Sequence, residues 1–347
     1  MPWPVLPFTA VVTAFMIGAA AAAQPIPLPQ SRPDIGVRID KPIATPLPQP
    51  ATTADPQPLP SADTINPDRF GAKPADPAYG AFQRGLYKTA YNLALVRAQN
   101  GDPAAQTLVA EILSRGLGVP LNQAEAAKWY ALAAEQGIPE SQFQYALMLL
   151  DGRYVKKDEK EAYALMQAAA EAGNRLAQFN FAQLLVQQDP GDAGIAKAVP
   201  YYERAAATGL ADAQYAMSQV YANGVGGKPR DDTQARSLLA LAARQNYDTA
   251  QIDLAAWMIE GRGGARDLKS GFGWMKQAAE GGNVAAQNRL AKLYMGGIGT
   301  DPDLILAGAW YIIARRAGLV DSEMDDFLQG LSDDQTKQAL EKANRLP

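Results

Sequence analysis

The stretch that decides the fold is AAQNRLAKLYMGGIG at residues 285–299, because variants of it recur along the chain. One such variant is AQYAMSQVYANGVG at residues 213–226. In both, a Gln is followed four positions later by a small residue and ten positions later by a Gly. Self-similarity at a fixed period is the mark of a repeat architecture. The spacing between copies is therefore the first quantity to establish.

The Gln recurs at intervals of 36 residues, with one step of 37, and other columns keep the same spacing. The Gln column is Gln106, Gln142, Gln178, Gln214, Gln251 and Gln287. A small residue follows each: Ala110, Ala146, Ala182, Ser218, Ala255 and Ala291. A second small column is Ala126, Ala162, Ala198, Ala235, Gly271 and Ala307. A bulky column is Trp129, Leu165, Tyr201, Leu238, Trp274 and Trp310. Independent columns that agree over six units indicate six structural repeats.

Helix start and stop signals divide each unit into a first helix, A, and a second helix, B. Helix A opens with a pair such as Asp102-Pro103, in which Asp caps free N–H groups and Pro fits the first turn. It stops at a glycine that can take a left-handed conformation: Gly116, Gly152, Gly224, Gly261 or Gly297. Helix B opens at Asn122, Asp158, Asp231, Asp267 or Asp303. Glu125 and Glu161 are predicted capping-box partners.

Unit three departs from this punctuation, with Asp189-Pro190-Gly191 making the turn and Gly194 at the cap position. In all units the two small columns predict a close approach of helices A and B. The bulky column is predicted to fill the gap to the next unit, since one repeat cannot bury its apolar face alone.

These segments, together with AAKWYALAAEQG at residues 126–137, resemble Sel1-like repeats, which are relatives of the tetratricopeptide repeat. The resemblance implies an all-α fold, a right-handed α/α superhelical solenoid of about six helix pairs with terminal capping helices. The predicted repeats are 101–136, 137–172, 173–208, 209–245, 246–281 and 282–317. Residues 79–100 are predicted to form a leading B-type helix, and residues 318–347 to form capping helices, with Ser332 and Gln335 in a capping box.

The N-terminal part reads as targeting and linker sequence. Residues 1–23 are apolar and uncharged and end in an AxA-like site before Gln24, which predicts a cleaved signal peptide. A marginal membrane anchor is the alternative. Residues 24–78 hold 14 of the 25 prolines and are predicted to be a disordered linker, with a docking site for a Pro-binding module as the alternative. We therefore expect secretion across the inner membrane to the periplasm, with no membrane insertion after processing, or else N-terminal anchoring.

Composition limits the chemistry that is open to this chain. It has no Cys and no His, which removes thiol nucleophiles, disulfides, Cys or His zinc sites and imidazole acid–base catalysis. A net charge of -4 supplies no basic excess for phosphate backbones, so nucleic acid is not an expected partner. No catalytic residue, cofactor or metal ligand is predicted, and the chain is predicted not to be an enzyme.

A candidate binding groove follows from the resemblance. In tetratricopeptide-like superhelices helix A lines the concave groove, and the matching positions stand one, five and eight residues beyond the Gln. These positions are polar in the end units, for example Glu111 and Lys292, and largely apolar in the middle units. The candidate groove residues are Phe143, Leu147, Leu150, Phe179, Val186, Tyr215, Ile252 and Ile259. Either this stripe binds a partner, or the superhelix fills its own groove.

The sequence thus predicts a non-catalytic scaffold, adaptor or regulator in the cell envelope that binds a protein or peptide in this groove. One alternative is a carboxylate-dependent cell-wall or glycan enzyme, which would need two acidic residues facing each other. Another is a purely structural spacer. The sequence leaves the identity of the partner and the oligomeric state open.

Overall fold

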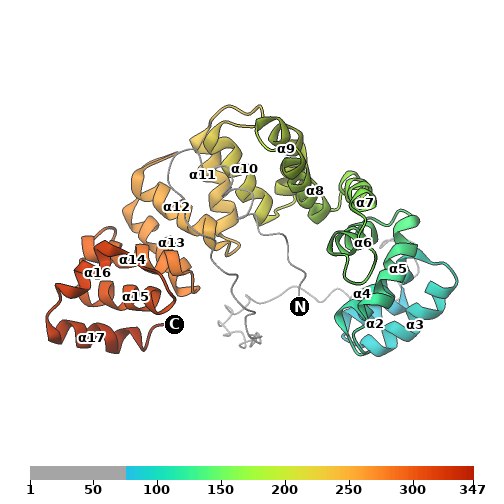
Figure 1. Cartoon of the computed structure of the whole chain (residues 1–347), viewed down its shortest axis with the longest axis horizontal. Coiled ribbons are helices and arrows are strands. Elements are labelled where there is room, and N and C mark those ends of the chain that lie inside the picture. Colours follow the sequence, from blue (N-terminus) through green and yellow to red (C-terminus); the bar gives the residue numbers. More distant parts are fainter. Residues whose placement is uncertain (1–75) are drawn as a thin grey trace, which may run out of the picture. The chain divides into compact units, whose positions relative to one another are not determined.

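The computed structural model describes residues 76–347, which form sixteen helices joined by turns and contain no strand (Figure 1). The predicted signal peptide, the alternative anchor and nearly all of the Pro-rich linker lie outside the described residues. Within the described part, consecutive helices contact each other from α2 to α16, and α17 packs against α15. An all-helical repeat fold is therefore confirmed.

Twelve of the helices form the six predicted A and B pairs. The A helices are α4 (Pro103–Arg115), α6 (Pro139–Asp151), α8 (Arg175–Gln188), α10 (Ala211–Asn223), α12 (Asp248–Glu260) and α14 (Val284–Gly296). The B helices are α5 (Gln123–Glu135), α7 (Glu159–Glu171), α9 (Asp192–Ala207), α11 (Asp232–Ala243), α13 (Leu268–Glu280) and α15 (Leu304–Arg316).

Most predicted caps form. Asp102 accepts hydrogen bonds from the N–H groups of Ala104 and Ala105. All five predicted B-helix caps accept a backbone N–H within the first turn. The five stop glycines of the A helices take positive φ, as at Gly224 with φ 65°. At Glu125 and Glu161 only the backbone half of the capping box is recorded, and the Glu125 carboxylate instead pairs with Lys128.

The Gln column has a structural role that spacing alone did not reveal. In every unit the side-chain amide nitrogen donates to the backbone carbonyl eight residues earlier, in the last turn of the preceding B-type helix. Gln251, for example, donates to the carbonyl of Ala243 at 3.1 Å. The last carbonyls of a helix have no partner within it, so this amide satisfies a buried polar group at each joint between units.

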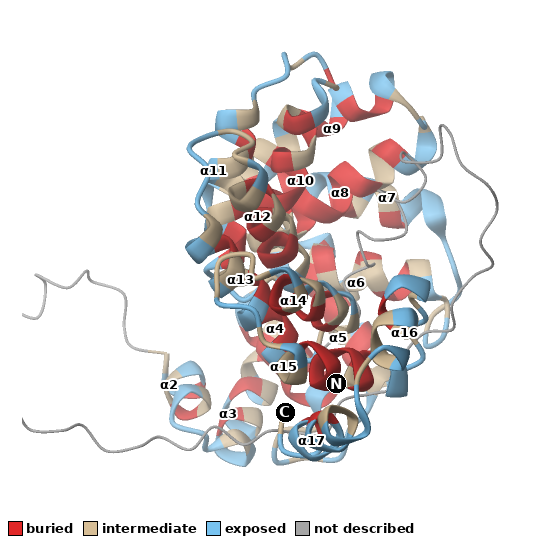
Figure 2. Ribbon diagram, turned by 90° about the vertical axis from the view of Figure 1, so that its left-hand side faces the viewer, coloured by how far each residue is buried: buried red, intermediate tan, exposed pale blue. Residues whose placement is uncertain are grey.

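The small columns lie where helices A and B approach each other, and their alanines and Ser218 are fully buried. A Cβ on Gly271 would come within 2.8 Å of the Ala255 carbonyl oxygen, so this approach excludes a side chain there. Figure 2 shows buried stretches through the middle of α8, α10 and α12.

The bulky column lies partly between units, since Tyr201 and Trp274 each pack against two of the apolar clusters. Its members are half-buried, apart from Trp310. The residue after each one is buried instead: Tyr130, Met166, Tyr202, Leu239, Met275 and Tyr311. One residue turns a helix by about 100°, so a shift of one position moves a side chain from the edge of the contact to its centre.

Unit three keeps its predicted turn but departs from the other units in length. The turn covers Asp189 to Gly191, and α9 begins at once at Asp192, so that this B helix has 16 residues. Gly194 lies inside α9, where a Cβ would meet the Asp189 carbonyl oxygen at 1.8 Å. Only glycine fits at that position.

The ends differ partly from expectation. A single leading helix over residues 79–100 was predicted, but two form, α2 (Pro77–Gln83) and α3 (Tyr87–Gln99). Gly85 has φ 75°, which breaks the helix between them. Helix α2 also begins inside the predicted linker. At the other end α16 (Ser322–Gln329) and α17 (Asp333–Ala343) follow the repeats, and the Ser332–Gln335 capping box forms. No helix in residues 76–347 is long and apolar enough to span a membrane.

Candidate protein-binding face

The A helices lie in a row, and polar side chains link neighbouring members. Thr107 on α4 bonds Ser141 on α6 at 2.8 Å between hydroxyl oxygens. Farther along, the Asn283 amide at the start of α14 donates to the Asp248 carboxylate of α12 at 2.9 Å. These contacts fix the spacing of the A helices, and the helices together form one face of the repeat region. We call it the helix-A face.

The eight candidate groove residues all lie on A helices but do not share one environment. Phe143, Phe179, Val186, Tyr215 and Ile252 are buried. Leu147, Leu150 and Ile259 are half-buried. The eight are also divided among three separate clusters of packed apolar side chains. The structure therefore places the first position after the Gln in the core of the middle units, as a self-filled groove requires.

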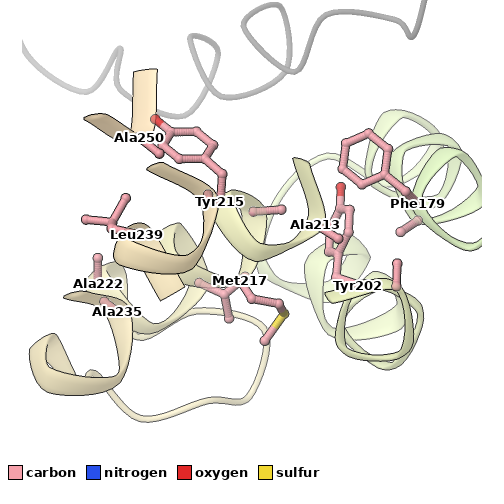
Figure 3. Packing of buried hydrophobic residues seen from close by; sticks show 14 of the residues in the cluster. Phe179, Tyr202, Ala213, Tyr215, Met217, Ala222, Ala235, Leu239 and Ala250 are labelled. Atoms are coloured by element: carbon pink, nitrogen blue, oxygen red, sulfur yellow. The ribbon is translucent and has the colours of Figure 1, made fainter. Parts of the chain in front are cut away.

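The aromatic residues at this first position pack against the chain's own side chains. The Phe179 ring lies 5.7 Å from the ring of Tyr202 on α9, between centroids, and the Tyr215 ring lies 5.2 Å from that of Tyr247. Figure 3 shows Tyr215 and Met217 pointing to opposite sides of α10. Whether a partner also contacts these residues stays a prediction.

The surface that the helix-A face offers in the middle units comes from the fifth and eighth positions. Leu147 and Leu150 lie at the edge of the cluster that contains Phe143, and Ile259 lies at the edge of the cluster that contains Ile252. Gln183, at the fifth position of unit three, is buried, and its amide nitrogen has no hydrogen-bond partner among the described residues. The exposed part of the face is thus apolar at these positions, whereas the unpartnered Gln183 amide nitrogen is buried.

Asp253 adds a carboxylate to this face that the sequence did not indicate. It accepts hydrogen bonds from the Tyr215 hydroxyl at 3.0 Å and from the Gln219 amide at 3.5 Å. It forms no ion pair within residues 76–347, and burial raises the pKa of its carboxyl group. The pKa of Tyr215 is also raised, first by burial and then by the nearby Asp253 charge. The charges of Arg289 and Arg262 act in the opposite direction and lower the pKa of Asp253 in part, although neither arginine forms an ion pair with Asp253.

At the C-terminal end, the corresponding charges are already paired. Lys292 on α14 lies 2.8 Å from Asp321 and 2.6 Å from Glu323, and the Asn288 amide also donates to Asp321. The bonds from Lys292 and Asn288 lower the pKa of Asp321 to about 2. This end of the face is therefore closed by its own ion pairs, whereas Asp253 in unit five forms no ion pair within the described residues.

No group of three or more potential metal ligands gathers within residues 76–347. On the helix-A face, Asp253 and Tyr215 both have a raised pKa, and burial is the first cause in each case. The middle units of this face supply apolar contact and the Asp253 carboxylate.

Six stacked helix pairs on a regular period, joined through a buried Gln, define an α/α repeat solenoid. A family model of the Sel1 repeat matches residues 103–138, 139–174, 176–210, 211–247, 249–283 and 284–319, which is more than half of the chain. The chain therefore belongs to the Sel1 repeat family, whose members are generally scaffolds for protein–protein interaction rather than catalysts. The matched repeats start two or three residues later than the predicted bounds, close to the first residue of each A helix.

Solved structures support the same fold. A Sel1 repeat protein from Oxalobacter formigenes is 26% identical, with a TM-score of 0.60 over 72% of this chain and 100% of that one. The protective antigen c5321 of uropathogenic Escherichia coli is 26% identical, with a TM-score of 0.51 over 74% of this chain and 63% of that one. Chitin synthase regulatory factor 3 of Schizosaccharomyces pombe is 28% identical over 39% of this chain but only 15% of its own length.

Proposed function

We propose that this chain is a non-catalytic adaptor or regulator of the cell envelope, which binds a protein or peptide on its helix-A face. The observation that carries the proposal is the contrast along this face. Its first-position rings are buried in the core, while Leu147, Leu150 and Ile259 keep part of their apolar surface exposed. Partly exposed apolar side chains that gather on one face are typical of a surface that a partner covers.

Asp253, which forms no direct ion pair within the described residues, supports a partner with a basic side chain. A Lys or Arg of the partner at ion-pair distance from this carboxylate would further relieve the cost of its burial. The hydrogen bonds from Tyr215 and Gln219 and the more distant charges of Arg289 and Arg262 relieve that cost in part. The similarity to a regulatory factor also favours a role in controlling another protein. That relative matches over a small part of its length, so its particular target is not carried over to this chain.

The test is site-specific photocrosslinking in intact cells, scanning the helix-A face. A photoreactive residue at Leu147, Leu150 or Ile259 should give one discrete product of higher mass. The matched controls are Leu132 and Leu241, which lie on B helices and are 43% exposed each. Products of the same yield at Leu132 and Leu241 would show that capture is unspecific, and no product at any position would favour the structural spacer.

We further propose that the chain is exported and acts in the periplasm. The support is the uncharged apolar leader at residues 1–23, which ends in small residues before Gln24. Sequencing the N terminus of protein purified from its native cells should return Gln24 or a close neighbour. Intact Met1 in a membrane fraction would favour the anchored form, and a cytosolic pool would refute export.

A further inference from the structure

The outer side of the last repeat carries an open cleft of about 430 Å³, bounded by α15, α16 and α17. Helix α16 takes the place of a seventh A helix, because Lys292 and Asn288 bind its first turn as neighbouring A helices bind each other. It ends after eight residues, whereas the repeat A helices have 13 or 14. Helix α17 then packs along α15, and the space between the two short helices is left open.

The floor and walls of this cap cleft are mainly apolar. Ile312 on α15 lies at the floor, Leu328 on α16 forms one wall and Leu340 on α17 forms the other. Leu340 is 41% exposed, although a terminal cap needs a polar outer face for solubility. An exposed Leu beside a ligand-sized hollow is therefore surface that a bound group would cover.

Two arginines of the last turn of α15 stand at the same cleft, and only one of them is neutralised. Arg315 lies 3.4 Å from the Asp325 carboxylate, which also accepts a hydrogen bond from the Tyr311 hydroxyl at 2.7 Å. Arg316 donates to the side-chain oxygen of Asn344 at 3.0 Å and has no ion pair within the described residues. The cleft thus holds an apolar hollow with one guanidinium group free for an anion.

We propose that the cap cleft binds a segment of a partner protein in which one bulky apolar side chain stands directly beside a carboxylate, as at a chain end in Phe or Leu. The side chain covers Leu328 and Leu340, and the carboxylate meets the planar donor fork of Arg316. The chain as a whole carries a net charge of -4 and repels anions, so the binding depends on this arginine. The site is separate from the helix-A face, and its failure would leave the function proposed above intact.

The test uses the full chain and the peptide Gly-Ser-Gly-Ser-Phe with a free carboxylate, titrated by NMR. A contact of this size should give a dissociation constant on the order of 1 mM. The same peptide with a C-terminal amide should bind at least fivefold more weakly, because it offers no charge to Arg316.

Variants then assign the binding to the cleft. Arg316→Gln should remove the preference for the acid over the amide, and Leu340→Ser should weaken both peptides. Lys337→Gln removes the same charge from the outside of α17, and Leu304→Ser changes a leucine of nearly equal exposure at the far end of α15. Both controls should bind as the unchanged chain does. If Arg316→Gln fails to fold, Arg316→Lys keeps the charge that complements the helix end and should retain a weaker preference.

Several results would overturn the proposal. Equal affinity for the acid and the amide, or an unchanged preference in Arg316→Gln, would show that the peptide carboxylate does not bind Arg316. Loss of binding in Lys337→Gln to the same extent would mean unspecific attraction. Binding of octanoate with the same dependence on Arg316, but of no peptide, would assign the cleft to a lipid-like amphiphile instead of a protein.

Discussion

Each internal B helix is covered on both sides by A helices, whereas α15 is covered on its outer side by two shorter helices. In the repeats the small columns are fully buried, and a glycine such as Gly271 stands where no side chain fits. At the cap, Leu340 on α17 stays exposed, and a cleft stays open beside α15. The comparison teaches that the repeating pattern specifies packing only where another repeat follows. The cap cleft lies where that pattern ends, whereas the helix-A face lies within the repeats.

The largest expected effect separates a buried ring of the repeats from an exposed leucine of the cap. Phe179→Ala should cost about 3–5 kcal/mol, because it empties a volume in the core beside Tyr202. Leu340→Ala should cost less than about 1 kcal/mol. Urea denaturation followed by circular dichroism measures both. A Phe179→Ala variant that unfolds at the same urea concentration as the parent would mean that this ring lies on the exposed face and not in the core.

The Gln column is expected to matter next. Gln251→Leu leaves the Ala243 carbonyl without its donor at a buried joint and should cost about 1–3 kcal/mol. Gln167→Leu is the matched control, since Gln167 is exposed on α7 and should change stability by less than about 0.5 kcal/mol. Equal effects in the two variants would mean that the amide bond contributes nothing to the stacking of units.

Alanine substitutions at two helical glycines should change the stability by a smaller amount, and the sign of the change should differ between them. Gly273 on α13 has open space where a Cβ would stand, so Gly273→Ala should stabilise by about 0.5–1 kcal/mol through helix propensity. On Gly308 of α15, a Cβ would meet Ala339 at 3.0 Å and Leu331 at 3.3 Å. Gly308→Ala should therefore lose that gain or destabilise the cap. Thermal melts that rise equally for both variants would show that the cap is not packed as described.

The smallest expected effect is the pH dependence from Asp321. The pKa of this carboxyl group is lowered to about 2 in the folded chain, so between pH 2 and about 4 the unfolded chain binds more protons. The stability that Asp321 supplies is present above that window and is lost as the pH falls through it. Asp321→Asn should cost about 0.5–1 kcal/mol at pH 7 and nothing near pH 2. Asp326→Asn, on the exposed side of α16, is the control, and a constant difference from pH 7 to pH 2 would refute the linkage.

Much of the repeat architecture follows from the sequence, because its signals are local. A cap such as Asp158 or a stop such as Gly224 acts within one turn of helix, and the structure has both. The break at Gly85 was missed because one glycine inside a helical pattern does not reveal its φ. The bulky column is half-buried apart from Trp310, and the residue after it is buried, because periodicity defines a helix face only to within about one position.

The candidate face was harder to predict because burial there depends on how closely neighbouring A helices approach. Spacing places Phe143 and Leu147 on the same stripe, yet the structure buries the first and leaves the second half-exposed. Asp253 gave no signal, because other units have unrelated residues two positions beyond the Gln, such as Leu108 and Arg289. The cap cleft lies where the repeat ends, so no column could have indicated it.

The central claim is that the exposed part of the helix-A face, and not its buried rings, binds the partner. The most direct measurement is the affinity of the crosslinked partner, once purified, for the double variant Leu147→Ser/Leu150→Ser, with Leu132→Ser as the control. We predict at least tenfold weaker binding for the double variant, with a melting temperature within a few degrees of the parent, and no change for the control. Equal affinity for the parent and the double variant, with both folded, would contradict the claim.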